Sequence, residues 1–340
     1  MKASSWRVDR DAYVCVFVLL CFVFANVVLP RVAAGQDAPL VFQYEPVNYE
    51  TVPYEAPKGR VTIDGMLLFR DGVGEDQSLV FDDSSGFSEP VLSTGDFEFK
   101  NEFAGQVNVE FGSFHLGYFG SGELEESFTR ESPSTNVQFF NAAAAEERQR
   151  YTANYRSYLN LGDIGLRKEF GRFTSIYASG AIGRLKEDLN LIGESTVSAD
   201  PSDPNAAPNP PGSLTSEVEN NLYGVNLGAR RQLFNNGNLR LEITGVAGAY
   251  FNDMEVNATS ANHQGKWNDS DIAYSGVANA SLVIPAWPVN FRVGYQAVWL
   301  SGVAIAPEAS RTLDIIGNGG DISTNDVLYH GLIIGVEKLW

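Results

Sequence analysis

The stretch VNFRVGYQAVW, from Val289 to Trp299, decides the fold class. Its apolar side chains stand at every second position, and Asn290, Arg292 and Gln296 fall between them. Such alternation places one face of an extended strand in an apolar medium and the other face in a polar one. The same period of two recurs along the chain, for example over 97–111, where Phe97, Phe99, Phe103, Val107, Val109 and Phe111 share one face. We therefore expect an all-β protein.

Ten segments with this character follow one another. The predicted strands are 60–70, 96–111, 113–127, 151–170, 173–190, 217–232, 239–253, 270–284, 289–304 and 325–340, and twelve strands is the alternative count. Tight connections, such as 112–113 and 285–288, alternate with long polar ones, such as 191–216 and 254–269. Short turns at one end and long loops at the other are typical of outer-membrane barrels, whereas a sandwich needs Greek-key crossovers. We predict a transmembrane up-and-down antiparallel β-barrel over 59–340.

Aromatic residues recur near both ends of the predicted strands. Five pairs are 11 to 13 residues apart: Phe99 and Phe111, Tyr158 and Phe170, Tyr223 and Phe234, Tyr274 and Trp287, and Tyr329 and Trp340. At ~3.3 Å per residue and a tilt near 45°, this spacing covers about 25–30 Å. It predicts an apolar band between two aromatic girdles at the membrane interfaces.

The first 34 residues have the character of a signal peptide. A basic start is followed by an apolar run over 12–29 and by the small residues of 32–34. An uncleaved anchor is the alternative, because the run nearly suffices to span a bilayer. Both cysteines, Cys15 and Cys21, lie in this segment, so the mature chain is expected to lack disulfides and thiol chemistry.

The segment 35–58 carries four prolines and precedes the first predicted strand. It is predicted to be a periplasmic tether or a plug that folds into the lumen. The sequence leaves these two alternatives open.

Composition excludes several classes of protein. The chain has 24 Lys and Arg residues against 42 Asp and Glu residues, a net charge of −18, which argues against a nucleic-acid partner. The aromatic content of 12% excludes a disordered acidic tail. Acidic residues gather in the predicted long loops, but their spacing fits no EF-hand, and no metal site or cofactor is predicted.

Polar faces of the strands are expected to line the lumen if the apolar faces contact lipid. The predicted lumen-lining residues are Glu98, Lys100, Glu102, Glu110, Arg156, Arg230, Arg240, Glu242, Arg292 and Glu337. Mixed charges across a narrow lumen favour ion pairs, because a single buried charge is costly. Ten strands form a small barrel, whereas open aqueous channels are typical at 16 to 18 strands. The sequence therefore leaves open whether the lumen conducts or is filled by its own ion pairs.

The last strand, VLYHGLIIGVEKLW, ends on the aromatic residue Trp340. It resembles the terminal strand of Gram-negative outer-membrane proteins that the barrel-assembly machinery recognises. The spacing of His330, Gly331, Gly335 and Glu337 is similar to the end of the β-barrel porin families known mainly from sequence. Trp in place of the commoner Phe, and a lysine two residues earlier, depart from that pattern. The resemblance implies export to the outer membrane, contact with membrane lipid and lipopolysaccharide, and porin-like behaviour.

Three functions are consistent with these patterns. The first is a passive pore for small solutes or ions, with a cation bias from the acidic loops and no enzymatic step. The alternative is a plugged structural or adhesion barrel that acts through its long acidic loops. The third is an enzyme, for which His263 near Asp253, Asp269 and Asp271, or His330 with a strand serine, are the only candidates. The oligomeric state and the solute do not follow from the sequence.

Overall fold

The computed structural model describes residues 58–71, 78–82, 89–97, 102–131, 137–139, 150–171, 173–194, 212–235, 237–260, 263–312 and 320–340. The predicted signal peptide and all but the last residue of the predicted tether lie outside these residues. The described elements, apart from the last residue of β8, belong to one compact unit formed by Pro57–Glu169 and Phe173–Trp340.

Strands make up almost all of this unit. The large strands are β1 (Gly59–Asp71), β4 (Glu102–Phe111), β5 (Phe114–Ser121), β6 (Leu124–Glu131), β8 (Arg150–Phe170), β9 (Thr174–Glu194), β10 (Gly212–Asn235), β11 (Arg240–Ser260), β12 (His263–Ile284), β13 (Asn290–Ala304) and β14 (Thr324–Leu339). The small elements are β2 (Ser78–Asp82), β3 (Glu89–Ser93), η1 (Thr94–Asp96), β7 (Val137–Phe139) and α3 (Ala306–Thr312). In the described part of the chain, no helix is long and apolar enough to cross a membrane.

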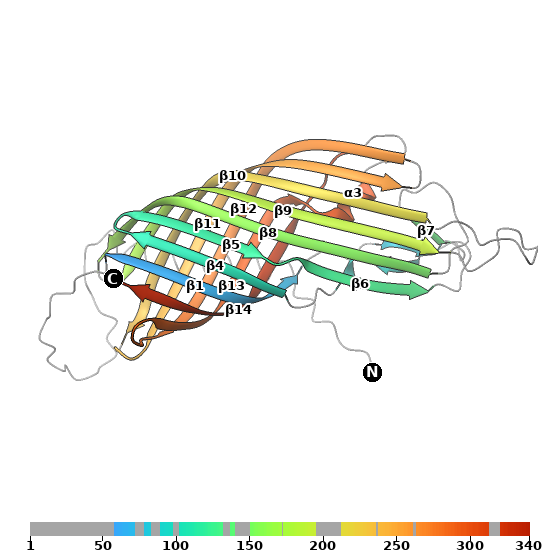
Figure 1. Cartoon of the computed structure of the whole chain (residues 1–340). Coiled ribbons are helices and arrows are strands. Elements are labelled where there is room, and N and C mark those ends of the chain that lie inside the picture. The colour runs from blue at the N-terminus through green and yellow to red at the C-terminus, as the bar shows by residue number, and fades with distance from the viewer. Residues whose placement is uncertain are drawn as a thin grey trace, which may run out of the picture. The chain divides into compact units, whose positions relative to one another are not determined.

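Ten strands close into a ring. Their order is β5-β4-β1-β14-β13-β12-β11-β10-β9-β8, and an additional pairing of β5 with β8 completes the circle. Antiparallel pairing joins the first and last strands of the ring, from Arg60 opposite Leu339 to Asp71 opposite Leu328. β6 continues the course of β5 along β8 after a break at Gly122. The predicted ten-strand up-and-down barrel is confirmed, and Figure 1 shows the tilted strands of its wall.

Large apolar side chains cover the outside of the barrel in two aromatic rows. The row near the tight turns contains Phe111, Phe114, Phe173, Phe234, Trp287, Phe291 and Trp340, and the second row contains Phe103, Tyr118, Tyr223, Phe251, Tyr274 and Tyr295. Between the rows, aliphatic side chains such as Val225, Leu227 and Ile334 are more than half exposed. An exposed apolar belt of this kind is stable only in contact with lipid, and closure of the sheet satisfies the backbone there.

Two residues predicted for the outer face lie inside instead. Tyr329, predicted as a girdle residue, is fully buried in the barrel, because the odd-numbered residues of β14 face inwards. Phe97 is also buried, with its ring packed edge-on against Phe128 and Tyr155. Both belong to an apolar core at the long-connection end.

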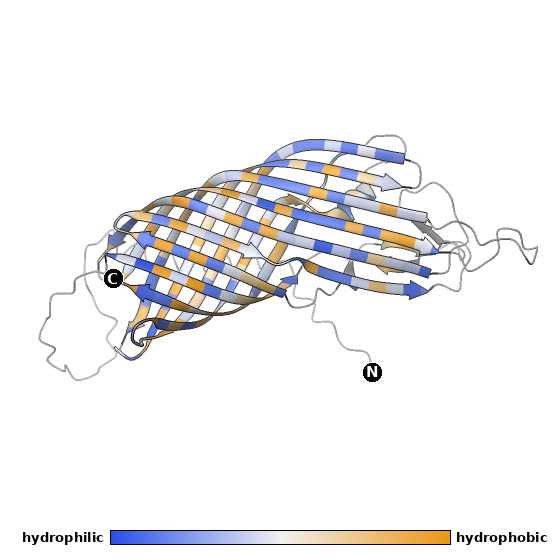
Figure 2. Ribbon diagram, viewed as in Figure 1, coloured by the Kyte–Doolittle hydropathy of each residue, from blue (hydrophilic) through white to orange (hydrophobic). Residues whose placement is uncertain are grey.

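Polarity reverses along the strands beyond the second aromatic row. On β10, Tyr223 and Leu227 face outwards, whereas Leu222 and Val218 are buried inside, so the apolar phase of the alternation changes at Leu222–Tyr223. The part of the barrel wall that extends beyond the membrane is in water, so its outer face is polar and its apolar side chains are buried inside the barrel. Figure 2 shows the alternating apolar and polar residues along each strand.

This reversal corrects one predicted loop. The stretch 254–269 was expected to be a long polar connection, but β11 continues to Ser260 and β12 begins at His263. Polar outward residues there, such as Glu255 and Lys266, belong to strands that stand in water and form an ion pair of 2.6 Å.

Candidate functional site

Nine charged side chains meet inside the barrel near the tight turns. They form the ionic cluster: Arg60, Asp64, Glu110, Arg167, Arg230, Arg240, Glu242, Arg292 and Glu337. The strand alternation that places apolar residues in lipid also turns these side chains inwards. Their exposed fractions lie between 0% and 12%, so water barely reaches them.

Two glutamates organise one half of the ionic cluster. Arg60 lies 2.7 Å from Glu242 and 3.2 Å from Glu337. Arg240 also contacts both carboxylates, 2.8 Å from Glu242 and 2.7 Å from Glu337. Arg292 approaches the same two groups at 3.6 Å. The two carboxylates are thus shared among three guanidinium groups.

Arg292 also has a carboxylate of its own. Its Nε donates to Asp64 Oδ1 at 3.0 Å. Opposite Asp64, on the neighbouring strand, is Gly335, where a Cβ atom would lie 2.1 Å from that same oxygen. A glycine at 335 therefore makes room for this ion pair, which gives a physical role to one position of the C-terminal pattern.

Glu110 organises the other half. It accepts hydrogen bonds from Arg167 at 2.5 Å and from Arg230 at 2.9 Å. The Tyr177 hydroxyl donates to the same carboxylate at 3.2 Å, and the Arg230 guanidinium lies 5.6 Å from the centre of the Tyr177 ring. Every oxygen of this buried carboxylate is therefore occupied, which is what buried charges require.

Six of the predicted lumen residues lie in this ionic cluster. They are Glu110, Arg230, Arg240, Glu242, Arg292 and Glu337. Glu102 starts β4 on the same face as Glu110 and is partly buried. Glu98 and Lys100 lie outside the described residues.

The prediction that Arg156 lines the lumen is wrong. Its side chain is 50% exposed on the outer face, where it approaches Glu123 at 3.6 Å and Glu125 at 3.9 Å. The polarity of β8 has already reversed at this height, so its neighbours Tyr155 and Ser157 face inwards.

Sequence reasoning missed three members of the ionic cluster. Arg60 and Asp64 alternate with outward-facing Val61 and Ile63 on β1, and Arg167 alternates with outward-facing Leu166 on β8. The signal was therefore present, since each residue has the parity opposite to an apolar neighbour. For Arg60 and Asp64, the low aromatic content of β1 masked this signal.

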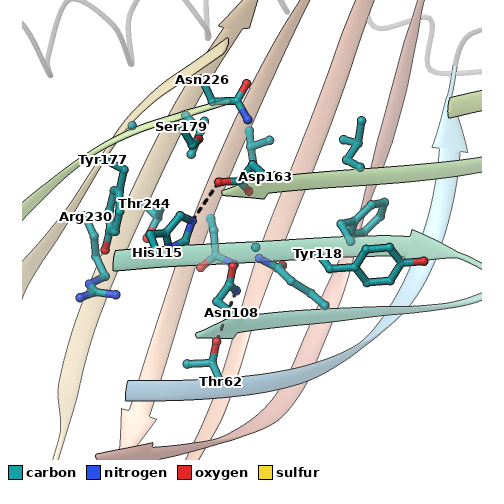
Figure 3. Close-up of a pocket in the computed structure, with 18 of the residues that line it drawn as sticks. Thr62, Asn108, His115, Tyr118, Asp163, Tyr177, Ser179, Asn226, Arg230 and Thr244 are labelled. Atoms are coloured by element: carbon teal, nitrogen blue, oxygen red, sulfur yellow. Dashed lines mark hydrogen bonds and ion pairs between the residues drawn. The ribbon is translucent and has the colours of Figure 1, made fainter. Parts of the chain in front are cut away.

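Above the ionic cluster is a cavity of about 140 Å³. Neutral polar side chains from several strands line it, among them Gln106, Asn108, Asn226, Thr244, Asn279 and Gln296. Many of these groups bond to one another across the wall, as Asn279 does to Gln296 at 2.9 Å. Figure 3 shows Asn108, Asn226 and Thr244 around this space.

A histidine–aspartate pair is also part of the cavity wall. His115 Nε2 lies 3.1 Å from Asp163 Oδ2, a contact drawn in Figure 3. A Cβ atom at Gly117 would lie 2.3 Å from the other Asp163 oxygen, so the glycine makes room for the carboxylate. The His115 ring packs 4.9 Å from that of Tyr177, which connects the pair to the ionic cluster.

An apolar plug lies inside the barrel on the opposite side of the cavity. Beyond Leu300, β13 bends inwards at a bulge, and the chain continues through Ile305 into α3. The plug consists of Val303, Ala304, Ile305, Ala306 and Ala309, all fully buried. It packs among leucines from the facing strands, including Leu185, Leu189 and Leu222.

Three polar residues of the facing wall hold the plug. Asn220 bonds to both backbone groups of Ala304, at 2.8 Å and 2.9 Å, and Asn252 donates to the Gly302 carbonyl at 3.0 Å. Glu187 accepts from the Ala306 amide at 3.0 Å. We call Glu187, Asn220 and Asn252 the plug latch.

Glu187 sits in a buried network of its own. It forms an ion pair with Arg70, and both side chains are 0% exposed. The Tyr155 hydroxyl donates to Glu187 at 2.5 Å, and burial raises the pKa of Tyr155 well above its usual value, so the hydroxyl keeps its proton. The latch therefore combines a charge pair with neutral donors.

The histidines proposed for an enzyme are not joined to the partners considered for them. His263 pairs with Ser260 at the strand tips, whereas Asp271 is opposite Asn252, about 26 Å further along β12 at ~3.3 Å per residue. His330 is on the outer face, 2.9 Å from Asp71 and bonded to the Tyr295 hydroxyl. Among the hydrogen bonds of the described residues, no serine approaches the His330 ring.

Comparison with known proteins gives matches of fold only. No family model and no curated protein matches the chain. Among solved structures, the outer membrane protease OmpT from Escherichia coli is 12% identical with a TM-score of 0.42, covering 83% of this chain and 96% of that one. The translocator domain of the autotransporter NalP from Neisseria meningitidis is 9% identical with a TM-score of 0.35, covering 95% and 98%.

A third match is a mutant of the monoaromatic hydrocarbon channel TodX, at 10% identity, a TM-score of 0.33, and coverage of 84% and 91%. The structures that this chain resembles are outer-membrane β-barrels. At these scores they do not decide between a protease, a translocator and a channel, so function rests on the site itself.

Proposed function

We propose that the chain is an outer-membrane channel for small polar solutes, and that the conformation described here is its closed state. The observation that carries the proposal is the polar cavity between the ionic cluster and the plug. A barrel does not need a polar cavity to be stable, because apolar or ion-paired side chains could fill its lumen instead. A compartment with a barrier on each side is what a gated path through a narrow lumen requires.

The outer surface supports the membrane location. The apolar belt between the two aromatic rows matches the lipid-facing band of transmembrane barrels. The tight turns then face the periplasm and the plug faces the cell exterior. We further propose that the strand ending in Trp340 is read by the barrel-assembly machinery, and that membrane lipid and lipopolysaccharide surround the belt.

The two barriers differ in kind. The ionic cluster consists of long side chains that open a path by changing rotamers, whereas the plug is a piece of backbone that has to move as a unit. Five arginines face four carboxylates in the ionic cluster, so the lumen itself does not favour cations. The cation bias expected from the acidic loops therefore has no counterpart at this level.

Weakening the plug latch should open the channel. We expect Asn220→Ala to increase stepwise conductance in planar bilayers, because it removes both hydrogen bonds to Ala304. The wild-type protein should conduct rarely under the same conditions. The matched control is Asn221→Ala, the next residue of β10, whose amide bonds to Glu219 instead.

Folding of each variant is checked by heat-modifiable gel migration. Absence of conductance from both the wild type and folded Asn220→Ala at high protein load would contradict the channel.

One observation favours a second function in that case: the nearly complete burial of the ionic cluster and of the plug. The chain would then be a closed barrel that acts through the part of its wall outside the membrane.

A further inference from the structure

We infer that the lumen cavity binds small neutral polyols, of about the size of glycerol. The inference names the solute class of the proposed channel and rests on that function. It is carried by the size of the cavity, the charge balance of its surroundings and the chemistry of its wall.

Size limits the ligand first. An engineered cavity of about 150 Å³ in another protein accommodates benzene, which has six heavy atoms. The cavity here measures about 140 Å³. It therefore has room for one molecule of about six heavy atoms, or for a few waters, and excludes hexoses and peptides unless the plug moves.

Charge balance argues against an ion. The ionic cluster holds five arginines and four carboxylates, and Asp163 in the cavity wall brings the acids to five, so the arginines and carboxylates around the cavity are equal in number. Each charge of the ionic cluster already has a partner of opposite sign within the protein. An ion entering the cavity would lose part of its hydration and find no free counter-charge, which is unfavourable.

The cavity wall provides hydrogen-bond donors and acceptors for hydroxyl groups. Amide side chains such as Asn226 and Gln296 provide donors and acceptors together, and a hydroxyl is itself both a donor and an acceptor. Among the described residues, Gln106 Oε1 and His115 Nδ1 are buried without a hydrogen-bond partner, so these two lining residues have unused bonding capacity. Apolar surface from Phe119 completes the wall and suits the C–H groups of a polyol.

Binding is measured on the full chain, folded in detergent micelles, by saturation-transfer NMR with glycerol as the probe. We expect weak binding, with Kd on the order of 1 mM for so small a ligand. Asn226→Leu should weaken binding at least tenfold, because it removes an amide from the wall and fills part of the cavity. Asn221→Leu, on the outward face of the same strand, should bind like the wild type.

A second variant guards against a folding defect. Thr244→Val keeps the shape of its side chain and removes only the hydroxyl, so it should weaken binding several-fold in a protein with normal heat-modifiable migration. Equal signals from the wild type, Asn226→Leu and Asn221→Leu would overturn the inference, as would no polyol signal or preferential binding of acetate or ammonium. The NMR experiment measures binding independently of transport. A barrel that binds polyols but shows no conductance would therefore refute only the proposed channel. A barrel that conducts but does not bind polyols would refute only the inference about the solute.

Discussion

Glu242→Leu should lower the free energy of unfolding by about 3–5 kcal/mol, the cost of removing one partner from a buried ion pair. The carboxylate of Glu242 is almost fully buried and contacts Arg60 at 2.7 Å and Arg240 at 2.8 Å. Its loss leaves these two arginines and Arg292 with Glu337 as the only remaining glutamate of that half of the ionic cluster. The measurement is urea unfolding in lipid vesicles, followed by tryptophan fluorescence.

Glu255→Leu is the matched control on the same strand. Glu255 is on the outer face beyond the second aromatic row and pairs with exposed Lys266. Surface ion pairs contribute little, so this variant should unfold like the wild type. A loss below about 1 kcal/mol for Glu242→Leu would show that the cluster is hydrated and that the lumen is open at this level.

Glu187→Leu should be the second severe variant. It removes the carboxylate that pairs with Arg70 and accepts the Ala306 amide, so it both breaks a buried ion pair and removes one attachment of the plug. We again expect about 3–5 kcal/mol of destabilisation. Protease cleavage within 302–312 should also become faster, because the plug loses one of its three attachments.

The double variant Arg70→Met with Glu187→Leu separates the two effects. Replacing a whole buried ion pair by apolar side chains is often neutral or stabilising. The double variant should therefore regain most of the lost stability while its plug stays more sensitive to protease than in the wild type. Asp188→Leu, whose side chain faces outwards towards Lys186, is the control. If Glu187→Leu and Asp188→Leu behaved alike, Glu187 would not hold the plug.

The strands could be predicted because the membrane imposes one rule on all of them. Between the aromatic rows, the outer face must be apolar, and segments such as 151–170 and 289–304 therefore show their limits to within a residue of β8 and β13. The tight turns are equally plain, since few residues separate two alternating runs. The charged residues of the ionic cluster follow from the same parity.

The plug and the outer part of the wall could not be predicted in this way. There the polarity reverses, so the assumption that apolar faces look outwards misplaced Arg156 and took 254–269 for a loop. The change of phase at Leu222–Tyr223 is visible in the sequence and marks the height at which the strand leaves the lipid. The position of α3 depends on contacts between distant strands, and no local pattern encodes them.

The central claim is that one closed wall stands in lipid with its apolar face outwards, and spin-label scanning along β10 tests it directly. Single cysteines at Tyr223, Gly224, Val225, Asn226 and Leu227 are introduced into a chain with Cys15→Ser and Cys21→Ser, labelled, and studied in lipid vesicles. We predict high collision rates with oxygen for the labels at 223, 225 and 227, and low rates for those at 224 and 226. Equal rates at all five positions, or free access of a water-soluble nickel reagent to 223, 225 and 227, would contradict the account.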